Sequence, residues 1–283
     1  IWVDETSQVA FGHKRLSILD LSMAGHQPMH SKCSRYSLIF NGEIYNHNDI
    51  RNKLQEVNEQ SLEWNGQSDT ETLLAAFTSW GIEKTLNECV GMFAIALWDK
   101  NEGTLTLARD RLGEKPLYYG WQGNTFMFAS ELKALKVHPD FTCEIDRNSL
   151  TLFLRYNYVP APYSIYKGIS KLSSGSFIQL SINSKELTSV IPYWSLSEVV
   201  FNGQSSPLNC NDEVAVSLLE NCLGSAVEEQ LISDVPLGAF LSGGIDSSLI
   251  VSMMKARTSQ PVKTFTIGFD DSDYNEAIYA KAV

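Results

Sequence analysis

The stretch Phe240-Leu-Ser-Gly-Gly-Ile-Asp-Ser-Ser248 sets two glycines, an aspartate and three serines between two apolar segments. Residues 235–241 have the composition of a short buried strand, and residues 249–254 have that of a helix. Residues 242–244 are therefore predicted to form a strand-to-helix turn. Glycine lets the backbone approach an anion closely, and the amides at the start of a helix attract phosphate oxygens. The turn is thus predicted to bind the phosphates of a nucleotide.

Asp246 restricts which ligands the turn is predicted to bind. A carboxylate repels a bare phosphate, so its presence predicts a divalent cation, Mg²⁺, between the two groups. An ordinary tight turn with a helix cap is the alternative, because Asp and Ser are also the residues that helix caps prefer. The Gly-Lys-Ser or Gly-Lys-Thr ending of the other common phosphate loop is absent from the sequence. The pattern matches the ATP pyrophosphatase type of loop, in which ATP is cleaved between its first two phosphates.

The composition predicts two domains and disfavours several kinds of partner. With 283 residues, 43% of them hydrophobic and 19% charged, the chain can form two cores. A net charge of -11 and scattered Lys and Arg residues disfavour a nucleic-acid surface. No apolar run approaches the ~20 residues that cross a bilayer. The five cysteines, an odd number without a Cys-x-x-Cys pair, indicate a reducing, cytoplasmic setting.

The order of the predicted elements divides the chain into an α+β part and an α/β part. Up to residue 131, apolar runs and helical spacing predict strands at 36–40, 92–98, 105–108 and 125–129 and helices at 47–56 and 69–80. After residue 211, helices alternate with two strands, the second at 262–269, which indicates a parallel sheet. The polar stretch 201–211 is predicted to be a linker between domains at 1–200 and 212–283.

Three clusters in the first domain complement a free amino acid. The first contains Arg15, the second contains Asn41, Gly42 and Glu43, and the third contains Asp69. A guanidinium suits an α-carboxylate, carboxylates suit an ammonium, and an Asn amide beside a backbone N–H can stabilise a carbonyl oxygen that becomes negative. Taken singly, the clusters also fit a surface charge, a hairpin turn and a helix cap. Taken together, they predict an amino-acid site.

These clusters, with four further motifs, resemble the family of glutamine-hydrolysing asparagine synthetases. The further motifs are Arg109-Asp-Arg-Leu-Gly113, Lys115-Pro-Leu-Tyr-Tyr119, Ala129-Ser-Glu-Leu-Lys-Ala-Leu135 and Ser233-Asp-Val-Pro236. The motifs keep their order from about residue 9 to the last residue. The resemblance implies an α+β domain like the N-terminal-nucleophile hydrolases, with four layers (αββα) and class II glutamine amidotransferase activity. It further implies that the start of an α/β parallel-sheet ATP pyrophosphatase domain follows.

The resemblance also implies a role for each matching residue. Asn41 and Gly42 would form the oxyanion hole, and Asp246 would lie near Mg²⁺. The glutamine pocket would be lined by Arg15, Leu16, Ser17, Ile18, Leu19, Asn41, Gly42, Glu43 and Asp69. ATP and its pyrophosphate would be contacted by Leu241, Ser242, Gly243, Gly244, Asp246, Ser247 and Ile267. For residues 109–111, Glu131 and Lys133, we expect a structural ion-pair network.

The nucleophile of the family is a cysteine at the start of the mature protein, and its own α-amine serves as the base. Ile1 is not that residue. An internal cysteine has no free α-amine, so we expect none of the five to replace it. We therefore expect the chain to be a fragment at both ends, lacking this nucleophile and the later motifs that shape the aspartate pocket. It should bind glutamine poorly and hydrolyse none.

For the complete protein, the resemblance implies glutamine-dependent asparagine synthesis. Ammonia from glutamine would react with a β-aspartyl-AMP made from aspartate and ATP, giving asparagine, glutamate, AMP and pyrophosphate. Two alternatives stay open: amidation of a different adenylated carboxylate of a sugar, peptide or β-lactam precursor, and a non-catalytic protein that senses glutamine or ATP. The expected partners are these small molecules, with neither nucleic acid nor membrane, and a homodimer on base rates alone.

Overall fold

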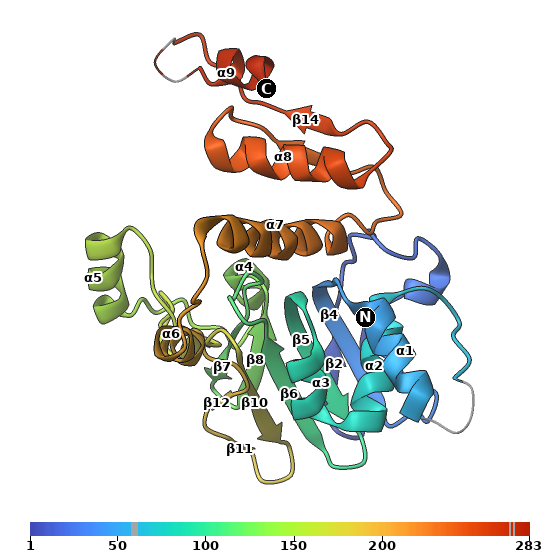
Figure 1. The fold of residues 1–283 in the computed structure, drawn as a ribbon. Coiled ribbons are helices and arrows are strands. Elements are labelled where there is room, and N and C mark those ends of the chain that lie inside the picture. Colours follow the sequence, from blue (N-terminus) through green and yellow to red (C-terminus); the bar gives the residue numbers. More distant parts are fainter. Residues whose placement is uncertain (58–61, 272, 274) are drawn as a thin grey trace. The chain divides into compact units, whose positions relative to one another are not determined.

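The computed structural model describes residues 1–57, 62–271, 273 and 275–283, and it divides them into two compact units (Figure 1). Unit 1 comprises Ile1–Ser17 and Ser22–Gly203. Unit 2 comprises Ile18–Leu21 and Gln204–Val283. The four residues 18–21 thus belong to unit 2, although the chain on either side of them belongs to unit 1.

Unit 1 is built on a seven-stranded antiparallel sheet in the order β11-β10-β6-β5-β4-β3, with β12 also paired to β10. The longest pair is β4 with β5, in register from Tyr36 opposite Asp99 to Ile44 opposite Gly91. The sheet confirms the strands predicted at 36–40, 92–98 and 105–108. Its members are β3 (Met29–His30), β4 (Tyr36–Ile44), β5 (Gly91–Asp99), β6 (Thr104–Arg109), β10 (Ser176–Ser181), β11 (Glu186–Leu187) and β12 (Ile191–Pro192).

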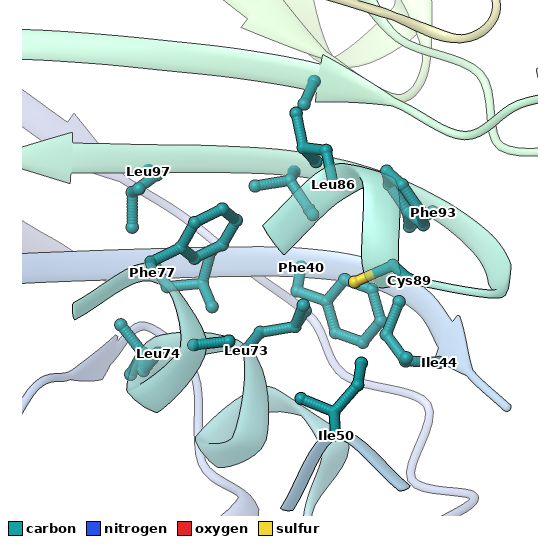
Figure 2. Packing of buried hydrophobic residues seen from close by; sticks show 14 of the residues in the cluster. Phe40, Ile44, Ile50, Leu73, Leu74, Phe77, Leu86, Cys89, Phe93 and Leu97 are labelled. Carbon is teal, nitrogen blue, oxygen red and sulfur yellow. The ribbon is translucent and has the colours of Figure 1, made fainter. Parts of the chain in front are cut away.

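Three helices cover one face of this sheet: α1 (His47–Val57), α2 (Asp69–Trp80) and α3 (Ile82–Glu88). Figure 2 shows Phe40 and Ile44 of β4 among apolar side chains of these helices, including Phe77. All three side chains are almost fully buried. The predicted start of α2 is confirmed, because the Ser68 hydroxyl accepts a hydrogen bond from the backbone N–H of Thr70.

The opposite face of the large sheet packs against a second, three-stranded sheet in the order β8-β7-β9. A hairpin of β1 and β2 joins this inner core, where Phe11 meets Phe128 edge to face. A short helix, α4, covers the outer face of the second sheet with the buried Leu135. The predicted αββα order of layers is confirmed. These elements are β1 (Trp2–Asp4), β2 (Val9–Phe11), β7 (Tyr118–Gln122), β8 (Thr125–Ala129), β9 (Ile169–Lys171) and α4 (Leu132–Leu135).

Outside these layers lie a single 3-10 turn, η1 (Met23–Gly25), and the helices α5 (Arg147–Tyr156) and α6 (Leu196–Ser205). Helix α6 extends into the stretch 201–211 that composition predicts to be a linker, and the boundary between the units falls within it. The polar residues there do not interrupt a helix that has already begun. It ends before residue 206 because a residue that precedes proline, here Pro207, disfavours the helical conformation.

Unit 2 contains two parallel strands, as predicted: β13 (Gly238–Phe240) and β14 (Lys263–Phe265). They alternate with α7 (Asp212–Glu229), α8 (Ile245–Arg257) and α9 (Ala277–Ala282). The prediction of a buried strand before the turn is wrong, because Phe240 is 80% exposed and its cross-strand partner Phe265 is 58% exposed. An apolar sequence pattern shows which side chains favour burial. It does not show whether another element covers them.

Candidate functional site

The edge of β4 that faces away from β5 carries a row of backbone amides. Gln27 accepts a hydrogen bond from the Phe40 N–H (2.7 Å), and Asp69 accepts one from the Ile44 N–H (3.0 Å). Backbone groups along a strand point to alternate edges with a period of two. The alternation therefore directs the Gly42 N–H to this same edge, between the two amides that Gln27 and Asp69 hold.

Gly42 lies where no side chain fits. A Cβ at this position would lie 2.0 Å from the backbone oxygen of Met92 and 2.7 Å from the Cα of Phe93, both on β5. A contact below 3.0 Å with backbone atoms requires a strand to shift. The close approach of β4 and β5 thus requires a glycine at this position.

The side chains of Asn41 and Glu43 lie on the face of β4 that is opposite to helices α1–α3. Ile39 is on the same face and packs in the core between the two sheets. The Asn41 Nδ2 donates a hydrogen bond to the Ser130 hydroxyl (3.0 Å), which follows β8 of the second sheet. Ala94 stands directly opposite Asn41 on β5, so its small side chain leaves room beside the carboxamide. The predicted pair Asn41 and Gly42 therefore presents a side-chain amide and a backbone amide at one end of the inter-sheet space.

Two carboxylates and two cations set the electrostatics of this region. Burial and the nearby charge of Asp69 raise the pKa of Glu43, while Lys115 opposes the shift. Burial also raises the pKa of Asp69, and its hydrogen bond from the Ile44 amide and the charge of Arg15 oppose that shift. The structure therefore brings Arg15, Glu43 and Asp69 within electrostatic reach of one another. Two such carboxylates favour a cationic group between them.

The segment Arg15 to Leu19 divides between the two units. The Arg15 guanidinium lies against Gly25, where a Cβ would be 2.4 Å from its Nη1. Leu16 is 85% exposed. Ser17 is half-buried in unit 1, whereas Ile18 and Leu19 belong to unit 2, in which Leu19 is buried. Among residues 15–19, Arg15 is the residue whose charge lowers the pKa of Asp69.

Unit 2 holds residues 18–21 through a reciprocal pair of hydrogen bonds. The Asp234 backbone N–H donates to the Ile18 carbonyl (3.0 Å), and the Asp20 N–H donates to the Asp234 carboxylate (2.7 Å). Asp234 is part of the motif at 233–236 that the resemblance includes. The motif thus has a structural role in unit 2 that the sequence did not reveal.

Asp69 follows a loop that two charged side chains hold in place. The Arg51 guanidinium donates to the carbonyls of Gly66 (3.0 Å) and Ser68 (2.9 Å), and the Glu71 carboxylate accepts from the Gly66 N–H (3.0 Å). Arg51 was not expected from the sequence. Glu71 was expected only as part of the helix start at residues 68–71, not as a side chain that holds the preceding loop. They stiffen the backbone immediately before Asp69, which favours a fixed position for its carboxylate.

The motif at 109–113 has a structural role, but the predicted ion-pair network is wrong for Arg109 and Asp110. The fully buried Asp110 accepts hydrogen bonds from four backbone N–H groups, and Arg109 donates to three carbonyls. Both side chains thus bind backbone groups and do not pair with each other. The amides belong to Phe93, Leu112, Glu114 and Lys115, and the carbonyls to Gly113, Lys115 and Leu172. Glu131 and Lys133 do form an ion pair.

In unit 2 the Ser-Gly-Gly turn follows the carboxyl end of β13. The Leu241 N–H donates to the Phe265 carbonyl (2.9 Å), and the Thr266 hydroxyl donates to the Leu241 carbonyl (2.7 Å). These bonds place the ends of two parallel strands side by side, where ligands of parallel sheets bind. Leu241 is buried, whereas Ile267 is 66% exposed.

The turn itself is closed by its own hydroxyls. The Ser242 and Ser247 hydroxyls lie 2.9 Å apart, and the Gly244 N–H donates to the Ser242 hydroxyl (3.3 Å). Gly243 has a φ of +80°, and a Cβ there would lie 2.5 Å from Tyr279 of α9. Gly244 is the N-cap of α8, whose exposed first turn carries Asp246.

Among the described residues, no group of three or more His, Cys, Asp and Glu side chains could hold a metal ion. The single exposed carboxylate of Asp246 nevertheless fits Mg²⁺, because this ion is commonly bound by one or two carboxylates together with substrate phosphates and water. Within residues 1–57, 62–271, 273 and 275–283, no helix is long and apolar enough to span a bilayer.

Residues 1–194 match the family described as a glutamine amidotransferase domain. The chain belongs to this family. Residues 218–283, which include the turn of unit 2, match the family described as asparagine synthase. The amidotransferase match spans the β4 edge and the asparagine synthase match spans the Ser-Gly-Gly turn, so the predicted resemblance is confirmed.

Curated relatives of this amidotransferase match nearly all of residues 1–283 and are longer than this chain. A putative glutamine-hydrolysing asparagine synthetase 2 of Methanocaldococcus jannaschii is 34% identical over 97% of this chain and 54% of its own length. Asparagine synthetase 1 of Bacillus subtilis is 36% identical over 96% of this chain and 41% of its own length. The chain therefore spans about half the length of the curated relatives it matches.

Among solved structures, glutamine phosphoribosylpyrophosphate amidotransferase of Bacillus subtilis aligns with a TM-score of 0.45 and 15% identity. The alignment covers 96% of this chain and 55% of that one.

Proposed function

We propose that the complete protein is a glutamine-dependent enzyme that makes asparagine. One domain releases ammonia from glutamine, and the other joins the ammonia to a β-aspartyl-AMP made from aspartate and ATP. The products are asparagine, glutamate, AMP and pyrophosphate. The observation that supports this proposal most is the presence in one chain of the acid-lined edge of β4 and the Ser-Gly-Gly turn after β13.

Glutamine fits the β4 site group by group. The Arg15 guanidinium binds the α-carboxylate, and the carboxylates of Glu43 and Asp69 bind the ammonium. The side-chain carbonyl oxygen of glutamine lies between the Gly42 N–H and the Asn41 amide. When a nucleophile adds to this carbonyl, its oxygen becomes negative, and both donors stabilise it more strongly than they do the neutral amide. Leu16 and Ser17, which follow Arg15 in unit 1, complete the proposed pocket.

None of the five cysteines in residues 1–283 is proposed as the nucleophile, because the proposed nucleophile uses its own α-amine as the base and an internal cysteine has none. Burial raises the pKa of the Cys89 thiol to about 12, so that thiol stays protonated and unreactive near neutral pH. A hydrogen bond with Ser31 lowers the pKa of Cys33, but Cys33 has no free α-amine to serve as its base. The remaining three, Cys143, Cys210 and Cys222, are exposed.

Glutamine binding is expected to weaken as the pH falls through the raised pKa of Glu43. Above that pKa the carboxylate is charged and holds the ammonium, and below it the neutral acid does not. The KM for glutamine should therefore rise on acidification with a midpoint above 4.5, the ordinary pKa of Glu. At neutral pH, Glu43→Gln should raise KM about 10–150-fold, as expected for a lost charge-assisted hydrogen bond of about 1.5–3 kcal/mol.

Steady-state glutaminase assays of the full-length protein between pH 4 and 8 measure both effects. The matched control is Glu83→Gln, which neutralises an exposed carboxylate on α3. A wild-type KM that is constant down to pH 4.5, or an unchanged KM in Glu43→Gln, would contradict this assignment.

The ATP site is proposed at the turn of unit 2. The backbone amides and hydroxyls of the turn hold the pyrophosphate, and Leu241 and Ile267 contact the nucleotide. Bound Mg²⁺ would supply positive charge that stabilises the departing pyrophosphate, with Asp246 as its protein ligand. The phosphate-binding residues are Ser242, Gly243, Gly244, Asp246 and Ser247.

Asp246→Ala should abolish AMP formation in the full-length protein and leave glutaminase activity within about twofold, because the two activities use different sites. Parallel assays of AMP release and glutamate release measure the two steps. Glu213→Ala is the control, since Glu213 is also an exposed carboxylate in the first turn of a unit 2 helix. Equal loss of both activities in Asp246→Ala would contradict the assignment of glutamine hydrolysis and AMP formation to separate sites.

The acceptor and the assembly belong to the same proposal. Aspartate is the proposed acceptor because the two matched relatives are named asparagine synthetases. Aspartate-dependent AMP release tests this choice of acceptor, and AMP release that depends on another carboxylate would identify that carboxylate as the acceptor instead.

A homodimer is proposed because two-fold dimers are the commonest assemblies. The five unpaired thiols support a cytoplasmic location.

A further inference from the structure

The Asn41 carboxamide is connected to the second sheet through one residue that has no assigned role. Its Nδ2 donates a hydrogen bond to the Ser130 hydroxyl at 3.0 Å. Asn41 is on β4 of the large sheet, and Ser130 follows β8 of the three-stranded sheet. The two residues are 89 positions apart in sequence.

The orientation of this carboxamide decides what it can do. A side-chain amide has an acceptor oxygen and two N–H donors, and its terminal torsion is broad and roughly two-fold. An amide turned by half a rotation would present oxygen where a nitrogen now lies, and an oxygen repels an oxyanion. The bond to Ser130 engages one N–H of Nδ2, which leaves the second N–H in a defined direction.

Both partners of this hydrogen bond stand on rigid elements. The hydrogen bonds of Gln27 and Asp69 hold the backbone of β4 on either side of Asn41. Ser130 follows Ala129, which pairs with Tyr118 of β7, and precedes α4, whose Leu135 is buried. A serine on a mobile loop could not fix the direction of an amide, but this one is held at both ends.

We propose that Ser130 is a positioning residue that orients the Asn41 amide toward the oxyanion formed during glutamine hydrolysis. This inference rests on the proposed glutaminase function and on the role of Asn41 in it. Ser130 acts on kcat, because the amide stabilises charge that exists in the transition state and is absent from bound glutamine. The alternative is a bond that only joins the two sheets, and it predicts lower stability with an unchanged kcat for the folded enzyme.

The test uses the full-length protein with glutamine and, separately, with ammonium as the nitrogen source. Ser130→Ala should lower kcat for glutamine about 5–30-fold, less than the 10²–10³-fold cost of deleting one oxyanion donor. KM for glutamine and the rate with ammonium should stay within twofold. Asn41→Ala should show the larger loss, and adding Ser130→Ala to it should lower kcat no further.

A matched pair of variants separates chemistry from folding. Ser130→Thr keeps the hydroxyl, and Val has nearly the shape of Thr but no hydroxyl. The Ser130→Thr variant should therefore keep most of the wild-type kcat, and the Ser130→Val variant should not. This pair decides the question even where Ser130→Ala fails to fold. A normal kcat in Ser130→Val, or an equal further loss when Ser130→Ala is added to Asn41→Ala, overturns the inference alone. A normal kcat in Asn41→Ala overturns the proposed oxyanion role itself, and the inference with it.

Discussion

Replacing Asp110 by alanine should lower the free energy of unfolding of unit 1 by about 4 kcal/mol, at roughly 1 kcal/mol or more for each of four backbone amides left without an acceptor. The carboxylate is completely buried, so water cannot replace it without entering the core. One of the four amides, that of Phe93, belongs to β5, and the others belong to the loop that follows β6. The variant should therefore loosen both the loop and its junction with the large sheet.

Chemical denaturation followed by tryptophan fluorescence measures this loss selectively. All six tryptophans of residues 1–283 lie in unit 1, so within these residues the fluorescence signal reports on that unit. Glu114→Ala is the control, because Glu114 is an exposed carboxylate in the same loop. It should shift the free energy by less than about 0.5 kcal/mol. Equal stabilities for Asp110→Ala and the wild type would contradict the role inferred from the hydrogen bonds.

Replacing Gly42 by alanine should destabilise unit 1 by about 3 kcal/mol or more, because a methyl group there overlaps backbone and not a flexible side chain. The added carbon would lie 2.0 Å from the Met92 oxygen, so β4 and β5 must separate locally. The same shift would displace the Gly42 amide. We therefore expect glutaminase activity of the full-length protein to fall at least 100-fold, as for a lost oxyanion donor.

Gly12→Ala is the matched control for this change. Gly12 is exposed, and nothing lies within 4 Å of where its Cβ would be. Fluorescence-monitored unfolding and glutamate release should both stay close to wild type in this variant. A Gly42→Ala protein with wild-type stability and activity would show that β4 and β5 are not held as closely as the structure indicates.

Local patterns were sufficient to place many elements. The predicted helix at 47–56 is α1, one residue longer, and the helix at 69–80 is α2. The second was placed well because its cap, Ser68, is encoded beside it. The short strands β9, β11 and β12 were missed because two or three residues carry no periodicity. Their positions depend on partners elsewhere in the sheets.

The candidate site divides in the same way. Arg15, Asn41, Gly42, Glu43 and Asp69 were chosen by residue type and motif, and the structure gathers them around β4. The side chains that position them could not be predicted: Gln27 and Arg51 lie in no motif, and the motif at 129–135 contains Ser130 but does not reveal its bond to Asn41. Their partners lie 13 to 89 positions away in the chain, and no local pattern marks a contact across such a distance.

By itself, the sequence determined the chemistry that is available: a glycine-serine turn after an apolar strand, and a guanidinium, an amide and two carboxylates in three short clusters. Residue type and local spacing are properties of neighbouring positions, so they can be read without a fold. Only the tertiary structure decided that the Gly42 amide points off the edge of β4 and that Asn41 meets Ser130. It also decided that burial raises the pKa of Glu43 and Asp69. Strand direction, cross-sheet contacts and desolvation arise when distant segments pack together, and that packing is the step local patterns do not contain.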